Sequence, residues 1–221
     1  MKKYASKTLL VIAGPTAVGK TAVAISLAKK LGTSIISADS RQCYRELTIG
    51  TAKPGQEELK AVHHYFIDAF PASEAVTAAD FERLALGYLE EIFSKSDIAI
   101  ACGGTGLYLK ALTEGLDDMP PVDPAIVSEL DAQFGEAGLL WLQEQVRTED
   151  PLFFEQAETG NPARLLRALA FVRSTGKSIT TYRTGTRKDR DFRIIKIALE
   201  LPRDLLYKRI NRRVDDMMKA G

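Results

Sequence analysis

The sequence predicts an α/β fold, in which a parallel sheet is covered by helices and carries an inserted helical domain. In the first half, short segments that are apolar throughout alternate with amphipathic helical segments. Strands of this kind are typical of a parallel sheet that is buried on both faces. From about residue 114 to residue 191 the periodicity is helical and no convincing strand occurs, and a strand then resumes. This order indicates an α/β core with an insertion before its last strand.

The first half contains four expected strands and two expected helices. The strands are residues 8–13, 34–38, 64–67 and 98–102. A glycine-rich turn follows the first strand and leads into a helical pattern over residues 20–31. A long helix is expected over residues 77–94, with Thr77 as its cap and Asp80 in its first turn.

The second half supplies the domain boundaries. Three prolines between residues 120 and 124 mark the entry to the insertion, and the polar stretch 184–191 marks its exit. We therefore expect a core at 1–113, a helical insertion at 114–191 and a return to the core at 192–221. The return consists of a strand at 192–201 and a helix after Pro202. Because the chain ends inside or directly after that helix, we expect it to be truncated at the carboxyl end.

Composition narrows the class of protein. Hydrophobic residues make up 45% of the 221 residues and charged residues 27%, as in a globular protein with a core. The two cysteines, Cys43 and Cys102, form no CxxC motif, so we expect neither a structural zinc site nor a disulfide framework, and a cytoplasmic location. The apolar run at residues 9–13 is too short for a signal peptide or a membrane span.

The net charge of +1 hides an asymmetry along the chain. Residues 1–160 contain 14 Lys and Arg against 23 Asp and Glu, whereas residues 161–221 contain 16 against 6. A basic segment on an acidic body is consistent with binding to nucleic acid or another polyanion. A solvated helical face with a basic loop would produce the same counts.

One motif indicates phosphate binding. The pattern GxxxxGK[ST], which defines a P-loop, is matched in full by Gly14, Pro15, Thr16, Ala17, Val18, Gly19, Lys20 and Thr21. The expected strand before it and helix after it provide the required context. Backbone N–H groups of such a loop wrap a phosphate chain at the positive end of the helix. Lys20 adds a cation, and the Thr21 hydroxyl can ligate Mg²⁺. A chance glycine turn is the weaker alternative.

Only one acidic residue stands where the metal-binding carboxylate of a phosphoryl-transfer enzyme would be expected. Such enzymes place a second metal ligand at the carboxyl end of a core strand. The strand 98–102 ends in Cys-Gly-Gly-Thr, and Asp97 lies at its opposite end. Asp39, after the strand 34–38, could hold a metal or accept a proton from a substrate. It could also be a simple turn residue.

Six motifs together resemble the tRNA dimethylallyltransferase family, also called tRNA isopentenyltransferases. They are GPTAVGKT (14–21), DSRQCY (39–44), IGTAKP (49–54), GGTGLY (103–108), NPARLLRAL (161–169) and LLYKRINRRVDDM (205–217). The resemblance covers essentially the whole chain. It departs at Ala163 and Ala170, where the family commonly has Gln and Glu, and at Cys43, where an aliphatic residue is usual.

The resemblance implies a prenyl transfer with Mg²⁺ as the cofactor. Dimethylallyl diphosphate would donate its five-carbon group to N6 of the adenosine on the 3′ side of the anticodon in tRNA. Lys20, the loop amides and Mg²⁺ on Thr21 would stabilise the departing diphosphate, and Asp39 would orient the amine or take its proton. Thr105 resembles a family position near the reacting substrates, although a helix cap is the alternative.

The resemblance also implies binding residues. Arg209 and Arg213, four residues apart on one helix face, would lie near the diphosphate or form a solvated basic face. The tRNA anticodon stem-loop would contact Asp39, Ser40, Arg41, Gln42, Thr105, Arg164 and Arg167. Arg164 and Arg167 could instead pair with acidic residues such as Glu155 or Glu158. We expect a monomer that does not bind membranes.

Other candidates are expected to be structural, and two other functions stay open. His63 and His64 are adjacent and would point to opposite faces of a strand, so they cannot form one metal site. Trp141 is expected in the core of the insertion. A small-molecule kinase would bind ATP at the P-loop and use the insertion as a lid. A non-catalytic RNA-binding module would bind tRNA without turnover.

Overall fold

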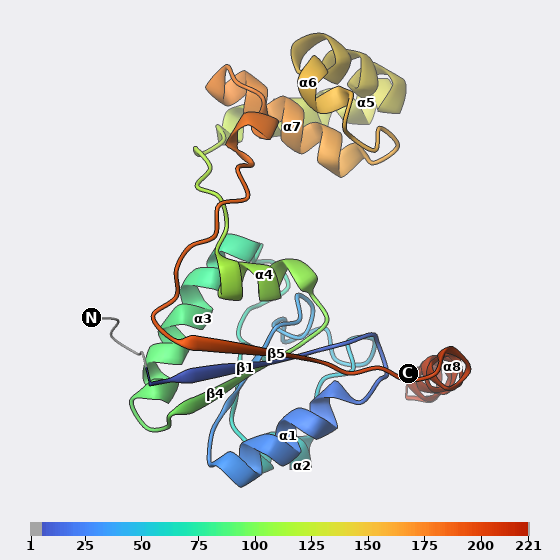
Figure 1. The fold of residues 1–221 in the computed structure, drawn as a ribbon. Coiled ribbons are helices and arrows are strands. Elements are labelled where there is room, and N and C mark those ends of the chain that lie inside the picture. The colour runs from blue at the N-terminus through green and yellow to red at the C-terminus, as the bar shows by residue number, and fades with distance from the viewer. Residues whose placement is uncertain (1–5, 221) are drawn as a thin grey trace. The chain divides into compact units, whose positions relative to one another are not determined.

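The computed structural model describes residues 6–220; residues 1–5 and 221 are not described. Its centre is a five-stranded sheet in which every strand pair is parallel, in the order β3-β2-β4-β1-β5 (Figure 1). The strands are β1 (Thr8–Ala13), β2 (Ile35–Ser37), β3 (His64–Tyr65), β4 (Ile98–Cys102) and β5 (Arg193–Ala198). All strands therefore end at one edge, where the P-loop leaves β1.

Helices cover both faces of the sheet, as Figure 1 shows. They are α1 (Lys20–Leu31), α2 (Gln56–Ala61), α3 (Ala78–Phe93) and α4 (Gly106–Glu114). Successive residues of a strand point to opposite faces. Leu9 and Val11 accordingly pack with α3 and α4, whereas Ile12 packs with α1. The strand is apolar throughout because both of its faces are buried.

The structure confirms the predicted α/β fold class and most of its elements. β1, α1 and β4 occupy the predicted residues, and α3 begins at Ala78 with Thr77 as its cap. The Thr77 hydroxyl accepts from the backbone N–H of Asp80, whose carboxylate accepts from the N–H of Thr77. The two helices α2 and α4 were not predicted.

The helical segment forms a compact unit of its own over residues 117–186. It consists of α5 (Pro124–Glu149), α6 (Pro151–Phe154), α7 (Pro162–Thr175) and the 3₁₀ helix η1 (Ile179–Tyr182). α5 is interrupted at Gly138, which has φ 74° and ψ −169°. The core of this unit is apolar and includes Leu142 and Leu165, with Trp141 packed against it as predicted.

The boundaries of the inserted unit differ from the predicted 114–191. Glu114 belongs to α4, and its carboxylate pairs with Arg187 and Lys196. The backbone N–H of Lys188 donates to the carbonyl of Glu114, and the Arg190 guanidinium pairs with Glu82 on α3. These contacts place residues up to 116 and from 187 onward in the core unit.

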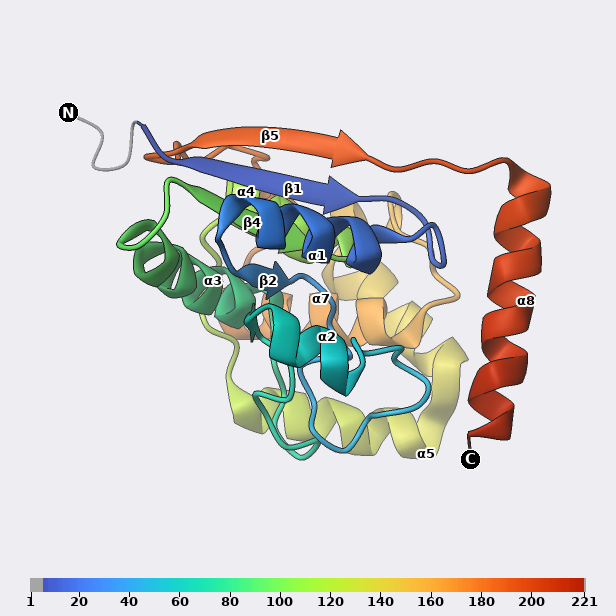
Figure 2. The ribbon, with the colours of Figure 1, turned by 90° about the horizontal axis from the view of Figure 1, so that it is seen from below.

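The last helix, α8 (Arg203–Lys219), follows β5 and begins after Pro202, as predicted. Figure 2 shows it beyond the carboxyl ends of β1 and β5. None of its residues is buried. It belongs to the core unit, and its Arg209 and Arg213 line one cavity with residues of the P-loop. Across residues 6–220, no helix has the length and apolar character that crossing a membrane requires.

Candidate active site

The P-loop owes its shape to backbone conformations that favour glycine. Gly14 has φ 149° and Gly19 has φ 106°, and Ala17 also has a positive φ of 64°. A β carbon on Gly14 would lie 2.6 Å from the carbonyl oxygen of Leu199, so a side chain has no space there. The loop then enters α1 directly at Lys20. Glycine at these positions thus permits the tight turn that a phosphate-binding loop requires.

The Lys20 ammonium folds back onto the loop. Its Nζ donates to the carbonyl oxygens of Gly14, at 2.9 Å, and Pro15, at 2.8 Å. Burial lowers the pKa of Lys20, and the positive charge of Arg213 lowers it further, while the Cys102 and Asp39 side chains act in the opposite direction. A half-buried cation whose hydrogen bonds go to neutral carbonyls favours an arriving anion.

Asp39 follows β2 and forms a turn with its own neighbours. Its Oδ1 accepts from the backbone N–H groups of Arg41, at 2.9 Å, and Gln42, at 3.3 Å. The turn interpretation of this residue is therefore correct. The carboxylate also lines the cavity beside the P-loop. It can therefore contact a substrate while it accepts the two hydrogen bonds of the turn.

Thr105 stands at the cap position of α4 but makes no side-chain capping bond. Its Oγ1 instead accepts from the backbone N–H of Ser40, at 3.0 Å, and lies 3.4 Å from the Ser40 hydroxyl. The backbone N–H of Thr105 donates to the carbonyl of Ala38. Thr105 is therefore the cap residue of α4, as the alternative has it, while its side chain ties the end of β4 to the loop after β2.

A cavity of about 440 Å³ unites the P-loop with residues from distant parts of the core. Its walls include the predicted residues Thr16, Ala17, Gly19, Lys20, Thr21, Asp39, Gln42, Arg209 and Arg213. Arg209 approaches the loop closely, because its Nη1 donates to the carbonyl of Val18 at 3.4 Å. Both arginines line the cavity beside the P-loop, Arg213 half-buried and Arg209 exposed, and their role toward a diphosphate stays a prediction.

Six of the predicted core-unit site residues, all within the described part of the chain, lie outside the cavity walls. They are Gly14, Pro15, Val18, Ser40, Arg41 and Thr105. Gly14 and Pro15 serve the loop through their carbonyls, which bind Lys20. Val18 is buried with 7% exposure. Their contribution to the cavity is thus through the backbone or through neighbouring residues.

The prediction missed several wall residues. These are Ala22, Ala52, Lys53, Pro54, Glu58, Cys102, Gly103 and Gly104. Three of them belong to the motif at residues 49–54, which contributed to the family resemblance but received no site role. Burial raises the pKa of the Cys102 thiol to about 11, so this wall residue is neutral near pH 7.

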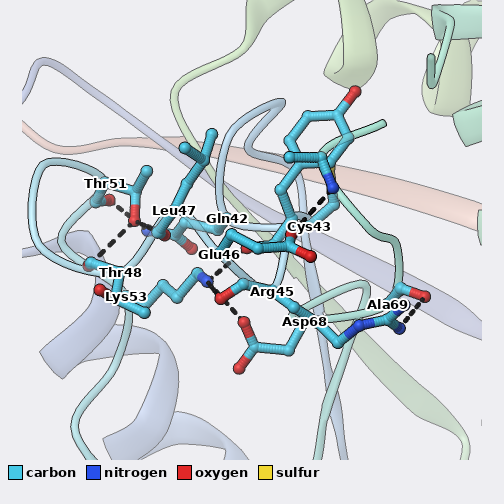
Figure 3. A network of polar contacts seen from close by, with 12 residues as sticks. Gln42, Cys43, Arg45, Glu46, Leu47, Thr48, Thr51, Lys53, Asp68 and Ala69 are labelled. Carbon is cyan, nitrogen blue, oxygen red and sulfur yellow. Dashed lines mark hydrogen bonds and ion pairs between the residues drawn. The ribbon is translucent and has the colours of Figure 1, made fainter. Parts of the chain in front are cut away.

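A network of polar contacts fixes the loop that carries Ala52 and Lys53 (Figure 3). The Gln42 amide nitrogen donates to the carbonyls of Thr51 and Ala52, both at 3.1 Å, and its oxygen accepts from Ser37. The Lys53 ammonium pairs with Asp68 and donates to backbone carbonyls of residues 44 and 45. Gln42 therefore uses its amide within the protein.

In the helical unit, three arginines surround a separate cavity of about 400 Å³. Arg164 and Arg167 of α7 line it together with Arg183, which had no predicted role. Arg164 pairs with Glu158 at 3.2 Å, and the two side chains are 63% and 72% exposed. The alternative in which Arg164 pairs with Glu158 is thus observed. Such an exposed pair contributes only about 0–1 kcal/mol, so it is easily exchanged for a phosphate.

The two histidines have structural surroundings, as predicted. His63 packs edge-on against Tyr65 with ring centroids 4.4 Å apart, and the His64 ring Nδ1 lies 2.9 Å from the Val62 carbonyl. Burial lowers the pKa of His64. Among residues 6–220 no group of three or more His, Cys, Asp or Glu side chains forms a cage for a metal ion.

The parallel sheet, the P-loop and the cavity at the carboxyl edge define an α/β P-loop protein with a helical insertion. Within that class, the chain belongs to the IPP transferase family, whose model matches residues 42–221. The chain is 44% identical to the tRNA dimethylallyltransferases of Cytophaga hutchinsonii and Christiangramia forsetii. These matches cover 99% and 98% of the chain and 72% of each relative.

Solved structures agree with the family. The full-length tRNA isopentenylpyrophosphate transferase of Bacillus halodurans is 37% identical with a TM-score of 0.60, over 97% of this chain and 67% of that one. A eukaryotic dimethylallyltransferase acting on tRNA is 26% identical with a TM-score of 0.77, over 97% of this chain and 54% of that one. The chain thus has the family fold over nearly its whole length.

Proposed function

We propose that this protein transfers the dimethylallyl group of dimethylallyl diphosphate to N6 of the adenosine 3′-adjacent to the anticodon in tRNA, with release of diphosphate. Family membership and the named relatives support this reaction. The observation that carries the proposal is the cavity that joins the P-loop lysine, two arginines and the carboxylate of Asp39, which follows a core strand; Glu58 supplies a second carboxylate to the walls. This set suits an anionic leaving group and one proton transfer.

The reaction depends mainly on stabilisation of the leaving group. Adenine N6 is a poor nucleophile, so positioning and stabilisation of the diphosphate dominate. Lys20 and the loop amides bind the diphosphate, and Arg209 and Arg213 complete the cationic wall. Lys20 must exchange its bonds to the carbonyls of Gly14 and Pro15 for bonds to phosphate oxygens.

Asp39 accepts the proton that the N6 amine loses. N6 forms a bond to C1 of the prenyl group, the C1–O bond breaks, and the diphosphate leaves with the electron pair. The amine must then lose one proton, and Asp39 is the carboxylate at the carboxyl end of a core strand in this cavity. Thr105 assists as a positioning residue, because its hydroxyl orders the loop that begins at Asp39.

The cavity suits Mg²⁺ that arrives with the diphosphate. Mg²⁺ prefers oxygen ligands and is usually held by one or two protein groups together with waters and substrate phosphates. The walls offer the hydroxyl of Thr21, which together with substrate phosphates and waters fits that pattern. When bound, the ion would neutralise charge on the departing diphosphate.

The tRNA anticodon stem-loop is the proposed partner. Ser40, Arg41 and Gln42 belong to the loop that Asp39 begins, and Arg164 and Arg167 provide cations in the helical unit. Because the Gln42 amide is occupied, its part is to hold the loop in shape. The free thiols of Cys43 and Cys102 support a reducing, cytoplasmic location, and a monomer remains our prediction, testable by light scattering.

The assay compares two reactions on one preparation. The protein is incubated with tRNA and labelled dimethylallyl diphosphate, and in parallel with labelled ATP and candidate metabolites. Label should appear in tRNA only in the first reaction and should be lost in the Lys20→Ala variant. Phosphorylated metabolites would instead identify a kinase, and tRNA binding without label transfer would identify a binding module.

A further inference from the structure

Lys53 is a cation in the wall of the P-loop cavity that had no predicted role. Only 9% of its side chain is exposed. Its ammonium donates to the carbonyls of Tyr44 and Arg45 and pairs with the carboxylate of Asp68 (Figure 3). Because an ammonium has three N–H groups, these three acceptors occupy all of them. The charge of Lys53 is therefore used within the protein, unlike that of Lys20, whose hydrogen bonds go to neutral carbonyls.

The Asp68 carboxylate is held in place by the core. The N–H of Phe70 donates to the carbonyl of Cys43 at 2.9 Å, and the N–H of Asp68 donates to the carbonyl of Gln42 at 3.1 Å. Asp68 has a positive φ of 52°, and Phe66 has one of 66°, a conformation that bulky side chains rarely adopt. Phe66 is 2% exposed within the hydrophobic core. Such a backbone persists only where its surroundings enforce it, so the turn that carries Asp68 is fixed.

The proposed base begins the segment whose last carbonyls Lys53 binds. The Asp39 carboxylate accepts from backbone N–H groups two and three residues further along, which orients it only within this segment. Contacts from elsewhere in the fold must therefore hold the segment at the cavity. At its start, the N–H of Ser40 donates to the Thr105 hydroxyl. In its middle, the Gln42 amide donates to two carbonyls of the loop before Lys53.

We propose that Lys53 and Asp68 are positioning residues, which hold residues 39–45 and with them the Asp39 carboxylate at the cavity; this inference rests on the proposed function. A group that accepts a proton must lie within hydrogen-bond reach of it. A displacement of about 1 Å can slow a reaction about 100-fold. The pair therefore acts on the rate of transfer. It does not act on diphosphate affinity, because the P-loop belongs to another part of the core.

The test uses a second lysine pair of the same kind as its matched control. Lys53→Met removes the charge and the three donors, whereas Asp68→Asn keeps the shape of the carboxylate and tolerates the positive φ. Lys7 lies at the opposite edge of the sheet, where the strands begin. Its side chain is 20% exposed, and its ammonium pairs with Asp97 at 2.7 Å and donates to the carbonyl of Ser96 at 3.2 Å. Lys7→Met therefore removes a comparable pair at a distance from the cavity.

Four properties are measured for each variant. They are the single-turnover transfer rate with both substrates saturating, the affinity for inorganic diphosphate, the amide hydrogen exchange of residues 39–45 and the melting temperature. We expect Lys53→Met to slow transfer by about tenfold or more. Exchange in 39–45 should become faster and diphosphate affinity should hold. Asp68→Asn should show the same pattern to a smaller extent, since its amide oxygen can still accept from Lys53. Lys7→Met should lower the melting temperature and change neither rate nor exchange in this segment.

The inference can fail in three ways. A loss of diphosphate affinity in Lys53→Met that matches the loss of rate would make Lys53 a ligand of the diphosphate. Unchanged exchange in residues 39–45, or faster exchange with a normal rate, would likewise overturn the positioning role. If Lys53→Met does not fold, Asp68→Asn decides, because the Asp68 side chain is 46% exposed. Absence of transfer in the wild type would reject the proposed reaction, whereas hydrogen exchange would still decide whether the pair fixes the segment.

Discussion

The carboxyl ends of β4 and β2 approach so closely at Gly103 that no side chain fits between them. A β carbon at this position would lie 2.1 Å from the carbonyl oxygen of Ala38 and 2.4 Å from its carbonyl carbon. Real β carbons essentially never approach within 3.0 Å, so Gly103→Ala must push the two backbones apart. Ala38 directly precedes Asp39, and the displacement therefore reaches the proposed base.

The backbone of Ala38 cannot move away from a β carbon at position 103 without losing hydrogen bonds. Its N–H donates to the carbonyl of Cys102 at 2.8 Å, and its carbonyl accepts from the N–H of Thr105 at 3.1 Å. Overpacking against backbone costs typically 1–3 kcal/mol, and a clash this close falls at the upper end, about 3 kcal/mol. That loss corresponds to a melting temperature lower by roughly 6–12 °C. A 1 Å displacement of a catalytic group can also slow transfer about 100-fold.

The neighbouring glycine provides the control. A β carbon on Gly104 would meet only the Lys20 Nζ, at 4.0 Å, which is an ordinary contact. Gly104→Ala should therefore change stability by less than about 0.5 kcal/mol. Far-UV circular dichroism in urea follows both variants, while fluorescence of Trp141, the sole tryptophan, follows the helical unit. Equal stability and equal rates for Gly103→Ala and wild type would refute the close-approach argument.

Three further predictions concern the chemistry and the partner. Lys20→Ala should lower the single-turnover transfer rate by about 100-fold or more, because one cation on the leaving group is lost; a near-normal rate would remove the P-loop lysine from the mechanism. Asp39→Asn should slow transfer by a similar factor while tRNA affinity and melting temperature hold, since the amide oxygen can still accept the turn bonds of Arg41 and Gln42. Asp39→Ala should lose stability as well, and a loss confined to tRNA affinity would make Asp39 a docking residue. The double variant Arg164→Gln and Arg167→Gln should flatten the log–log salt dependence of tRNA binding by roughly one or two units, with Arg83→Gln of the core as the control. An unchanged slope with a lower melting temperature would assign these arginines to structural pairs such as Arg164 with Glu158.

Elements whose pattern is local could be predicted from the sequence. β1 and β4 are buried on both faces and are therefore apolar throughout, which makes them visible as continuous runs. α4 received no predicted range because it begins at Gly106, close after Gly103 and Gly104, and such a glycine-rich stretch is typical of a turn. The bounds of the insertion were misplaced because the polar stretch after residue 186 pairs with Glu114 and Glu82 of the core.

In the candidate site, too, residues of a contiguous motif could be predicted, whereas residues placed by tertiary contacts could not. The P-loop is a contiguous motif, and its residues could be assigned without the fold. Lys53 and Glu58 could not be assigned to the site from the sequence, because their place in the cavity depends on the path of the chain between β2 and α2. That path is set by the Gln42 amide and by the Lys53 pair with Asp68, which are tertiary contacts. Thr105 was predicted as a site residue, but its bond to Ser40 became visible only in the structure.

The balance of charge in the cavity is consistent with our proposal that it binds a diphosphate. Its walls carry four cationic side chains, from Lys20, Lys53, Arg209 and Arg213, against two carboxylates, Asp39 and Glu58. Lys53 is neutralised by Asp68, which leaves three cations around the P-loop. Burial lowers the pKa of Lys20, so a bound anion would favour its charged form. The Cys102 thiol, with its raised pKa, adds no negative charge. Three cations against two carboxylates is the balance that we expect of a site for a diphosphate, with Asp39 as the carboxylate that we propose to take the amine proton.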